Sequence, residues 1–287
     1  MLDSPGGTPA PEPLRSLAGW TALELGGERF LVAAARSRLE RWPATEEAAD
    51  SLLRVTTTVT IFGARNGRHQ VDALSRGTPP ATSRWTEVQY GKRARAMQVE
   101  EGRLSAWRFN LPPGDALPAA GAWGKPGKPA VVAIPASAPA ACGTVDPYTL
   151  LLRLDCLSAD PTRRALLLSR EGTALVRVQR RERRIEKLKL RDLDTGRSID
   201  AQLVLQRLEL AGGGGAERAT AFGMVGDVSI WIDEASGAVV EIEGRHEHVP
   251  GTIRLRARAF SRRSAPRPAP PWPFVPAAQL DGGPAGS

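Results

Sequence analysis

Alternation of apolar and polar residues constrains this chain more than any other feature. From Thr252 to Ala259 every second residue is apolar, and the residues between are Thr or Arg. The same period recurs from Ser198 to Leu210 and from Val228 to Asp233, and Arg54 to Phe62 is rich in β-branched residues. In a strand, successive side chains point to opposite faces, so these segments predict strands with one buried and one wet face.

Short turn motifs separate the predicted strands. Asn66-Gly67, before the segment from His69 to Leu74, is a hairpin signal. Further turns are predicted at Tyr90-Gly91-Lys92, Asp194-Thr195-Gly196 and Glu234-Ala235-Ser236-Gly237. Many strands joined by short turns indicate one large meandering antiparallel sheet, not βαβ units.

Helix signals are few. Asp146 is a good N-cap, Pro147 fits the first helical position, and apolar residues follow as far as Leu154. A weaker helix is predicted over Ala44 to Leu53.

Composition bounds the domain organisation. The chain has 287 residues, of which 41% are hydrophobic, enough to bury a core. Residues 1–18 and 264–287 are rich in Pro, Gly, Ala and Ser, and we interpret them as disordered tails. The remaining residues, 19–263, are predicted to form a single β domain with a Pro/Gly-rich insertion near 110–141.

Basic residues outnumber acidic ones, 39 against 31, and the net charge is +8. A basic balance favours anionic partners, although an Arg-rich composition alone produces the same number. The densest run is Arg177 to Lys189, where Glu182 and Glu186 interrupt the cations. One interpretation is a stripe that follows phosphates; the one we favour is an edge or outer-face strand protected from aggregation by its charge. The run has no aromatic residues, so we do not expect nucleic acid as a partner.

Three kinds of side chain are candidates for a site. The two cysteines, Cys142 and Cys156, either form a disulfide or stay as free thiols. His246 and His248 are two apart, which places both imidazoles on one strand face, and a carboxylate such as Glu241 would have to complete a metal site. A solvated strand end is the alternative we favour, so we predict no metal and no other cofactor.

The seven tryptophans are spread along the chain. Some of them lie in strand-like segments, where they either line an apolar concavity or pack in the core. The residues predicted to line a ligand site are Trp85, Trp107, Leu151, Ile230 and Trp231.

The order of elements resembles a bacterial family known as domain of unknown function 3108. The resemblance is carried by Gly91-Lys92-Arg93 before an alternating strand, by the helix from Asp146 to Arg153, and by the Ile-Trp-Ile-Asp strand that leads to Val-Val-Glu-Ile-Glu-Gly over Ile230 to Gly244. It implies a secreted or periplasmic protein similar to outer-membrane lipoprotein carriers, with a curved, half-barrel-like sheet wrapped around one or two short helices. Two departures are the long insertion and the start of the chain: Met1 to Leu14 shows no leader, which on its own predicts a cytoplasmic protein.

These observations predict a binding protein and not an enzyme. No Gly-x-Ser-x-Gly nucleophile motif is present, and no apolar run approaches the roughly 18 residues of a membrane span. The first hypothesis is an envelope-associated protein that holds a lipid, a lipoprotein tail or a partner strand in an apolar concavity. The second is a structural or assembly factor that contacts anionic lipid or polymer through a basic surface. A metal-dependent hydrolase using His246 and His248 is a third, less favoured alternative.

Overall fold

The fold is described from a computed structural model of the chain. The structure describes residues 13–29, 33–46, 48–61, 64–77, 81–114, 116, 123–135, 141–169, 172–213, 224–246, 249–270 and 272.

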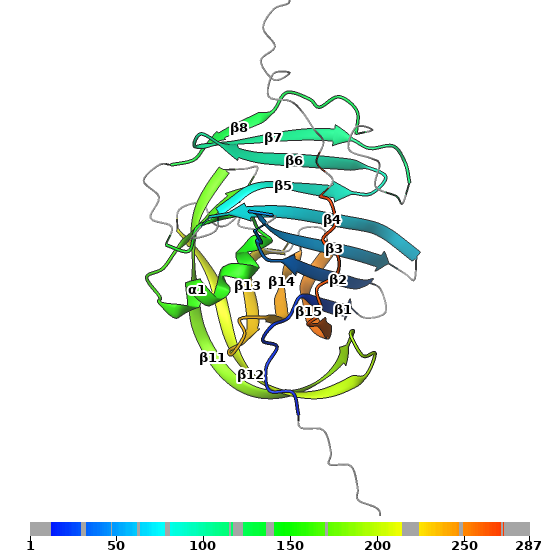
Figure 1. The fold of residues 1–287 in the computed structure, drawn as a ribbon, viewed down its shortest axis with the longest axis vertical. Helices are drawn as coiled ribbons and strands as arrows, with labels where there is room; N and C mark the ends of the chain where they lie inside the picture. The colour runs from blue at the N-terminus through cyan, green and yellow to red at the C-terminus, as the bar shows by residue number, and fades with distance from the viewer. Residues whose placement is uncertain are drawn as a thin grey trace, which may run out of the picture.

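The described residues form one 15-stranded sheet (Figure 1). Its first eight strands are β1 (Ala22–Arg29), β2 (Ala33–Trp42), β3 (Ser51–Ile61), β4 (Ala64–Arg76), β5 (Ala81–Gln89), β6 (Arg93–Glu100), β7 (Arg103–Asn110) and β8 (Ala130–Ala133). The remaining strands are β9 (Thr144–Val145), β10 (Ala165–Ser169), β11 (Gly172–Asp192), β12 (Ser198–Gly213), β13 (Met224–Asp233), β14 (Val239–His246) and β15 (Val249–Ser261).

Two meanders make up the sheet. Strands β1 to β8 pair in chain order, strands β9 to β15 do the same, and β1 joins the two by pairing with β15. All pairs are antiparallel except β9 with β10 and the short contact of β11 with β15. The prediction of a mainly β fold with a large antiparallel sheet is therefore confirmed.

The predicted helix exists but is displaced along the chain. A 3-10 helix, η2 (Thr149–Arg153), leads into α1 (Leu154–Ala159). Asp146 caps the preceding turn, because its Oδ1 accepts hydrogen bonds from the backbone N–H groups of Tyr148 and Thr149. Its Oδ2 accepts hydrogen bonds from the hydroxyls of Thr149 and of Thr82 in β5, which ties the helical segment to the first meander.

Two local predictions are wrong. Residues 44–50 form no helix where they are described, and β3 begins at Ser51. The β3–β4 hairpin does form, but Asn66 and Gly67 lie inside β4 and not at its turn, which falls at residues 62 and 63, outside the described residues. The register shifts between Val59 and Thr60, so Asn66 supplies the extra residue of a β-bulge. The other three predicted turns are confirmed, since each lies between consecutive paired strands.

The sheet curls around the helical segment, and the enclosed space is the main core (Figure 1). Leu23, Val55 and Trp85 enter this core from the first meander, and Leu154 and Leu157 enter it from α1, all of them at most 1% exposed. The curl brings β9, at one end of the sheet, against β5 of the first meander.

The second face of the first meander carries an apolar cluster on β5 to β7. Val88, Trp107 and Phe109 lie there, pointing away from the main core, and Leu111 and Trp123 cover them. The rings of Phe109 and Trp123 meet edge to face with 5.5 Å between their centroids. Part of the predicted insertion therefore closes a small second core.

Segments predicted as tails also pack on the domain where they are described. Leu17 is fully buried, and its N–H donates to Asp233 at the end of β13. Near the other end of the chain, Ala265 accepts a hydrogen bond from the indole of Trp42, and Trp272 packs against the same small cluster. The domain thus extends at least over residues 13–270.

Candidate functional site

The five residues predicted to line a ligand site do not lie together. Trp85, Leu151 and Ile230 belong to the main core and are at most 2% exposed. Trp107 belongs to the second core, on the opposite face of the first meander. Trp231 touches the main core, but as the neighbour of Ile230 in β13 it projects to the other face of that strand.

The predicted concavity is occupied, within the described part of the chain, by the protein's own side chains. Residues from both meanders and from α1 form one continuous buried cluster around Leu151. A hydrophobic ligand would reach Trp85 or Ile230 only by displacing neighbours, which costs several kcal/mol in a close-packed interior, on the order of 1–3 kcal/mol for each overpacked position.

The cysteines form a disulfide. Cys142 precedes β9 and Cys156 lies in α1, with 5.8 Å between their Cα atoms. The bond fixes α1 to the start of the second meander, beside the Asp146 cap.

The predicted metal pair cannot be placed. His248 and the side chain of His246 lie outside the described residues. Glu241, the carboxylate considered as a third ligand, instead contacts Arg254, as does Glu243 on the same strand. Over the described ranges no group of three His, Cys, Asp or Glu side chains is placed to hold a metal ion.

The inner face of β4 to β6 becomes polar at one end. His69 lies on β4, its ring centroid 6.2 Å from that of Tyr148. Glu87 and Arg95 face each other across β5 and β6, with 3.4 Å between Oε2 and Nη1. Burial, and to a lesser extent Arg95 and Arg93, lower the pKa of His69 to about 4. The imidazole is therefore neutral at pH 7 and can both donate and accept a hydrogen bond.

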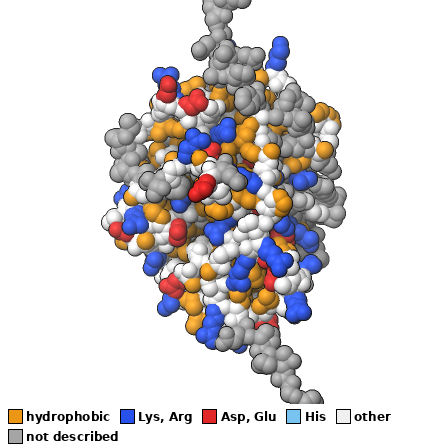
Figure 2. Space-filling view, in the orientation of Figure 1, with side chains coloured by type: hydrophobic (Ala, Val, Ile, Leu, Met, Phe, Trp, Pro, Cys, Tyr) orange, Lys and Arg blue, Asp and Glu red, His pale blue; other side chains and the backbone are white. Residues whose placement is uncertain are grey.

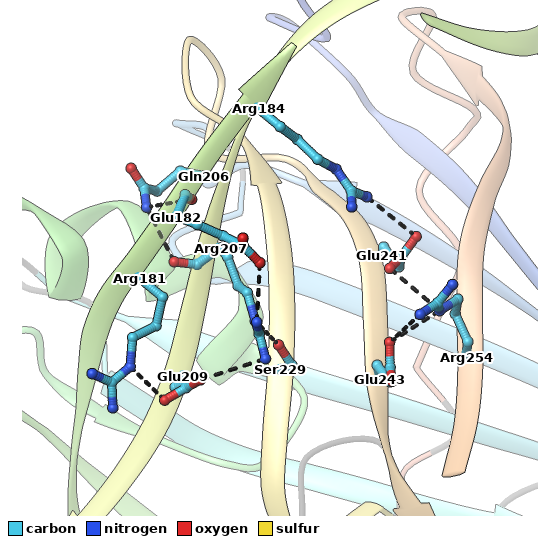
Figure 3. Close-up of polar contacts among 10 residues, drawn as sticks. All are labelled: Arg181, Glu182, Arg184, Gln206, Arg207, Glu209, Ser229, Glu241, Glu243 and Arg254. Atoms are coloured by element: carbon cyan, nitrogen blue, oxygen red, sulfur yellow. Dashed lines mark hydrogen bonds and ion pairs between the residues drawn. The ribbon is translucent and has the colours of Figure 1, made fainter. Parts of the chain in front are cut away.

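A network of ion pairs crosses the second meander (Figure 3). The guanidinium of Arg184 in β11 lies 3.8 Å from the ring centroid of Trp231 and 3.7 Å from Oε2 of Glu241 in β14. Arg254 and Arg256 of β15 each place a nitrogen 3.5 Å from a carboxylate oxygen of Glu241. Three arginines from two strands thus converge on one buried carboxylate.

Burial raises the pKa of Glu241, and the charge of Glu243 adds to that shift; Arg254 and Arg184 oppose it. The Glu241 side chain is 3% exposed, whereas that of Arg254 is 61% exposed. The network therefore has a buried centre at Glu241 and a solvent-exposed rim that includes Arg254.

The network continues onto β12. Glu209 accepts a hydrogen bond from Arg181 at 2.6 Å, and Glu182 accepts one from Arg207 at 3.0 Å. Arg207 also donates to the hydroxyl of Ser229 at 2.7 Å (Figure 3). Because the arginines of this face contact glutamates, it carries little net charge and is a poor anion site.

The opposite face of β11 carries unneutralised cations. A bulge between Arg180 and Arg183 places both residues on this face, followed by Ile185, Lys187 and Lys189. All five are exposed, and Ile185 is 67% exposed. Arg183 pairs with Glu234 at 2.8 Å, whereas the other three cations form no ion pair with any described residue. Figure 2 shows Lys and Arg side chains scattered over the lower part of the molecule, where β11 and β12 lie.

The sequence carries a signal for this network outside the basic run. Glu241 and Glu243 on one predicted strand and Arg254 and Arg256 on the next are each two residues apart, as cross-strand ion pairs require. The bulge, which places Arg180 and Arg183 on one face although they are three residues apart, has no comparable signal in the sequence.

Comparisons with known proteins give limited information. No family model and no curated protein sequence matches the chain. A solved structure, the beta-barrel-like protein of domain of unknown function DUF1849 from Brucella abortus, is similar over 83% of this chain and 94% of its own, with a TM-score of 0.43 and 8% identity. At this level the similarity carries no argument about function, and membership of family 3108 stays a prediction. No described helix is long and apolar enough to cross a membrane.

Proposed function

We propose that this chain is a non-enzymatic binding protein that takes an acidic partner on the exposed face of β11. The observation that carries the proposal is the contrast between the two faces of this strand. Cations on one face form ion pairs with glutamates. On the other face Arg180, Lys187 and Lys189 form none with any described residue and are available to a partner.

The core supports a surface site over an interior one. The space enclosed by the sheet is filled by the protein's own residues, so a lipid or lipoprotein tail has to displace them, whereas a partner on β11 displaces only water. Electrostatic attraction at an exposed strand also speeds association.

Labelled polyglutamate provides the test. We expect binding by fluorescence anisotropy at low salt, weakening about tenfold or more as NaCl rises from about 50 to about 200 mM, because exposed charges are screened. Lys187→Glu combined with Lys189→Glu should abolish it.

The matched control is Lys125→Glu combined with Lys128→Glu, which makes the same change in charge at exposed positions of the insertion. This control should keep most of the binding. Equal losses in the two double variants would show that only net charge matters, and binding that ignores salt would contradict the proposal.

We further propose that the protein works in the bacterial envelope or outside the cell. The Cys142–Cys156 disulfide supports this, since such bonds persist in oxidising compartments. Alkylation of thiols in protein isolated from its own cells should leave both cysteines unlabelled; full labelling before reduction would contradict it.

A further inference from the structure

Among the described residues, the edge of β11 that faces away from β12 has strand partners only at its two ends. β10 occupies it over Gly172–Val176, antiparallel, and β15 occupies it at Arg191 and Asp192, parallel. From Arg177 to Leu190 no described residue pairs with this edge, although β12 pairs with nearly all of the other edge. An unpaired strand edge offers a row of backbone N–H and C=O groups to another chain.

Both ends show that this edge accepts strands. The residues of β11 that border the gap already hold strand partners, so the backbone there has the extended conformation that pairing requires. The register shift between Arg180 and Arg183 interrupts the first part of the gap, which leaves residues 183–190 as the regular stretch.

The side chains of this stretch specify what fits beside it. Lys187 and Lys189 repel a second copy of the same edge, which disfavours pairing between identical chains. On the same face Ile185 is exposed, so an apolar residue suits the position opposite it. The other face of the stretch carries Arg184 and Glu186, which form an ion pair at 2.7 Å. Because these two charges neutralise each other, uncharged residues of an added strand suit the positions opposite them.

We propose that an extended acidic segment of a partner protein adds to the free edge of β11 as a further antiparallel strand in line with β10. Its acidic residues lie opposite the unpaired Lys187 and Lys189, and a third lies opposite Arg183, which it shares with Glu234. One apolar residue lies opposite Ile185. Main-chain hydrogen bonds supply affinity and the alternating charges set the register. The inference deepens the proposed function and rests on it.

The test uses three capped peptides of one composition and the intact protein. The first is Thr-Glu-Thr-Glu-Thr-Val-Thr-Glu-Thr, which follows the pattern derived above. The second groups the three Glu residues at one end, and the third is the first peptide with alternate backbone nitrogens methylated on its pairing edge. We expect the first to bind at least about tenfold more tightly than either control, because the second loses the placement of Glu opposite the cations and the third loses main-chain hydrogen bonds.

Hydrogen exchange supplies an independent readout. Binding of the first peptide should slow exchange at alternate amides between residues 183 and 190, those that point away from β12. A charge-reversed peptide with Lys in place of Glu should bind the protein carrying Lys187→Glu and Lys189→Glu, which shows that the same positions set the pairing.

The outcomes separate the two proposals. If polyglutamate binds and all three peptides bind equally, strand addition is overturned and the basic-surface function stands. Binding without protection of the β11 amides also overturns strand addition. If neither polyglutamate nor any peptide binds at low salt, both proposals fail.

Discussion

The two meanders of this protein treat the second face of the sheet differently. In the first meander that face carries two apolar clusters that irregular segments cover: Trp123 closes one, and Trp272 packs on the other. Ion pairs of Arg38 with Glu24 and of Arg54 with Asp72 lie beside these clusters on the same face. In the second meander the corresponding face carries Glu241 and its arginines, and remains partly open to solvent. One continuous sheet thus has a covered half, with apolar clusters on its second face, and a charged half, where ion pairs dominate that face.

The contrast shows two ways of stabilising a sheet that is already buried on its first face. Covering the face gains hydrophobic burial but needs long segments with anchoring aromatics. Pairing charges needs no extra chain and leaves the strands accessible, yet exposed ion pairs contribute little stability. We therefore expect stability to depend on the covered half and binding on the charged half.

Removing the cover should have the largest effect. Trp123→Ala empties a site that is 1% exposed and should lower the free energy of unfolding by about 3–5 kcal/mol. Urea denaturation followed by circular dichroism measures the change. A loss below about 1 kcal/mol would mean that the insertion does not close a core.

Acid should destabilise the protein through His69, which lies on the inner face of the first meander. The pKa of His69 is lowered to about 4 in the fold, whereas an unfolded histidine titrates near 6.5. The unfolded state therefore takes up the proton first as pH falls, and stability is lost between about pH 6.5 and 4, by at most about 3 kcal/mol. His69→Gln should flatten this part of the stability profile in urea titrations at several pH values. An unchanged profile would assign the acid sensitivity to other groups.

The centre of the ion-pair network should matter less than the cover. Glu241→Gln removes the charge that Arg184, Arg254 and Arg256 share, and we expect a loss of about 1–2 kcal/mol in thermal or urea unfolding, because these arginines are partly exposed and regain water. If Glu241→Gln lowered the free energy of unfolding as much as Trp123→Ala, stability would not depend mainly on the covered half.

The rim of the network should matter least. Arg181→Ala breaks the pair with Glu209, in which the side chains are 51% and 32% exposed, and should cost less than about 1 kcal/mol. Added salt should reduce even this difference, measured as the gap in midpoint urea concentration between variant and parent.

The pattern of residues predicts much of this fold and little of the candidate site. Alternation from Thr252 to Ala259 locates β15, and three of four predicted turns separate the strands as expected. Asn66-Gly67 fails as a turn because the hairpin register places it in a bulge, which local sequence does not specify. Trp85 and Trp107 look alike in sequence, yet the pleat sends them to opposite faces and into different cores.

By itself, the sequence determined the mainly β class, the single large meander-built sheet and the presence of a capped helical turn, because these follow from side-chain period and local hydrogen bonding. Only the tertiary structure decided that the enclosed space is filled, that Cys142 meets Cys156, and that the charges of β11 divide between a neutralised face and a free one. Those outcomes depend on the curvature of the sheet, on register and on a single bulge. Each is set by contacts between residues far apart in the chain, and no local pattern encodes them.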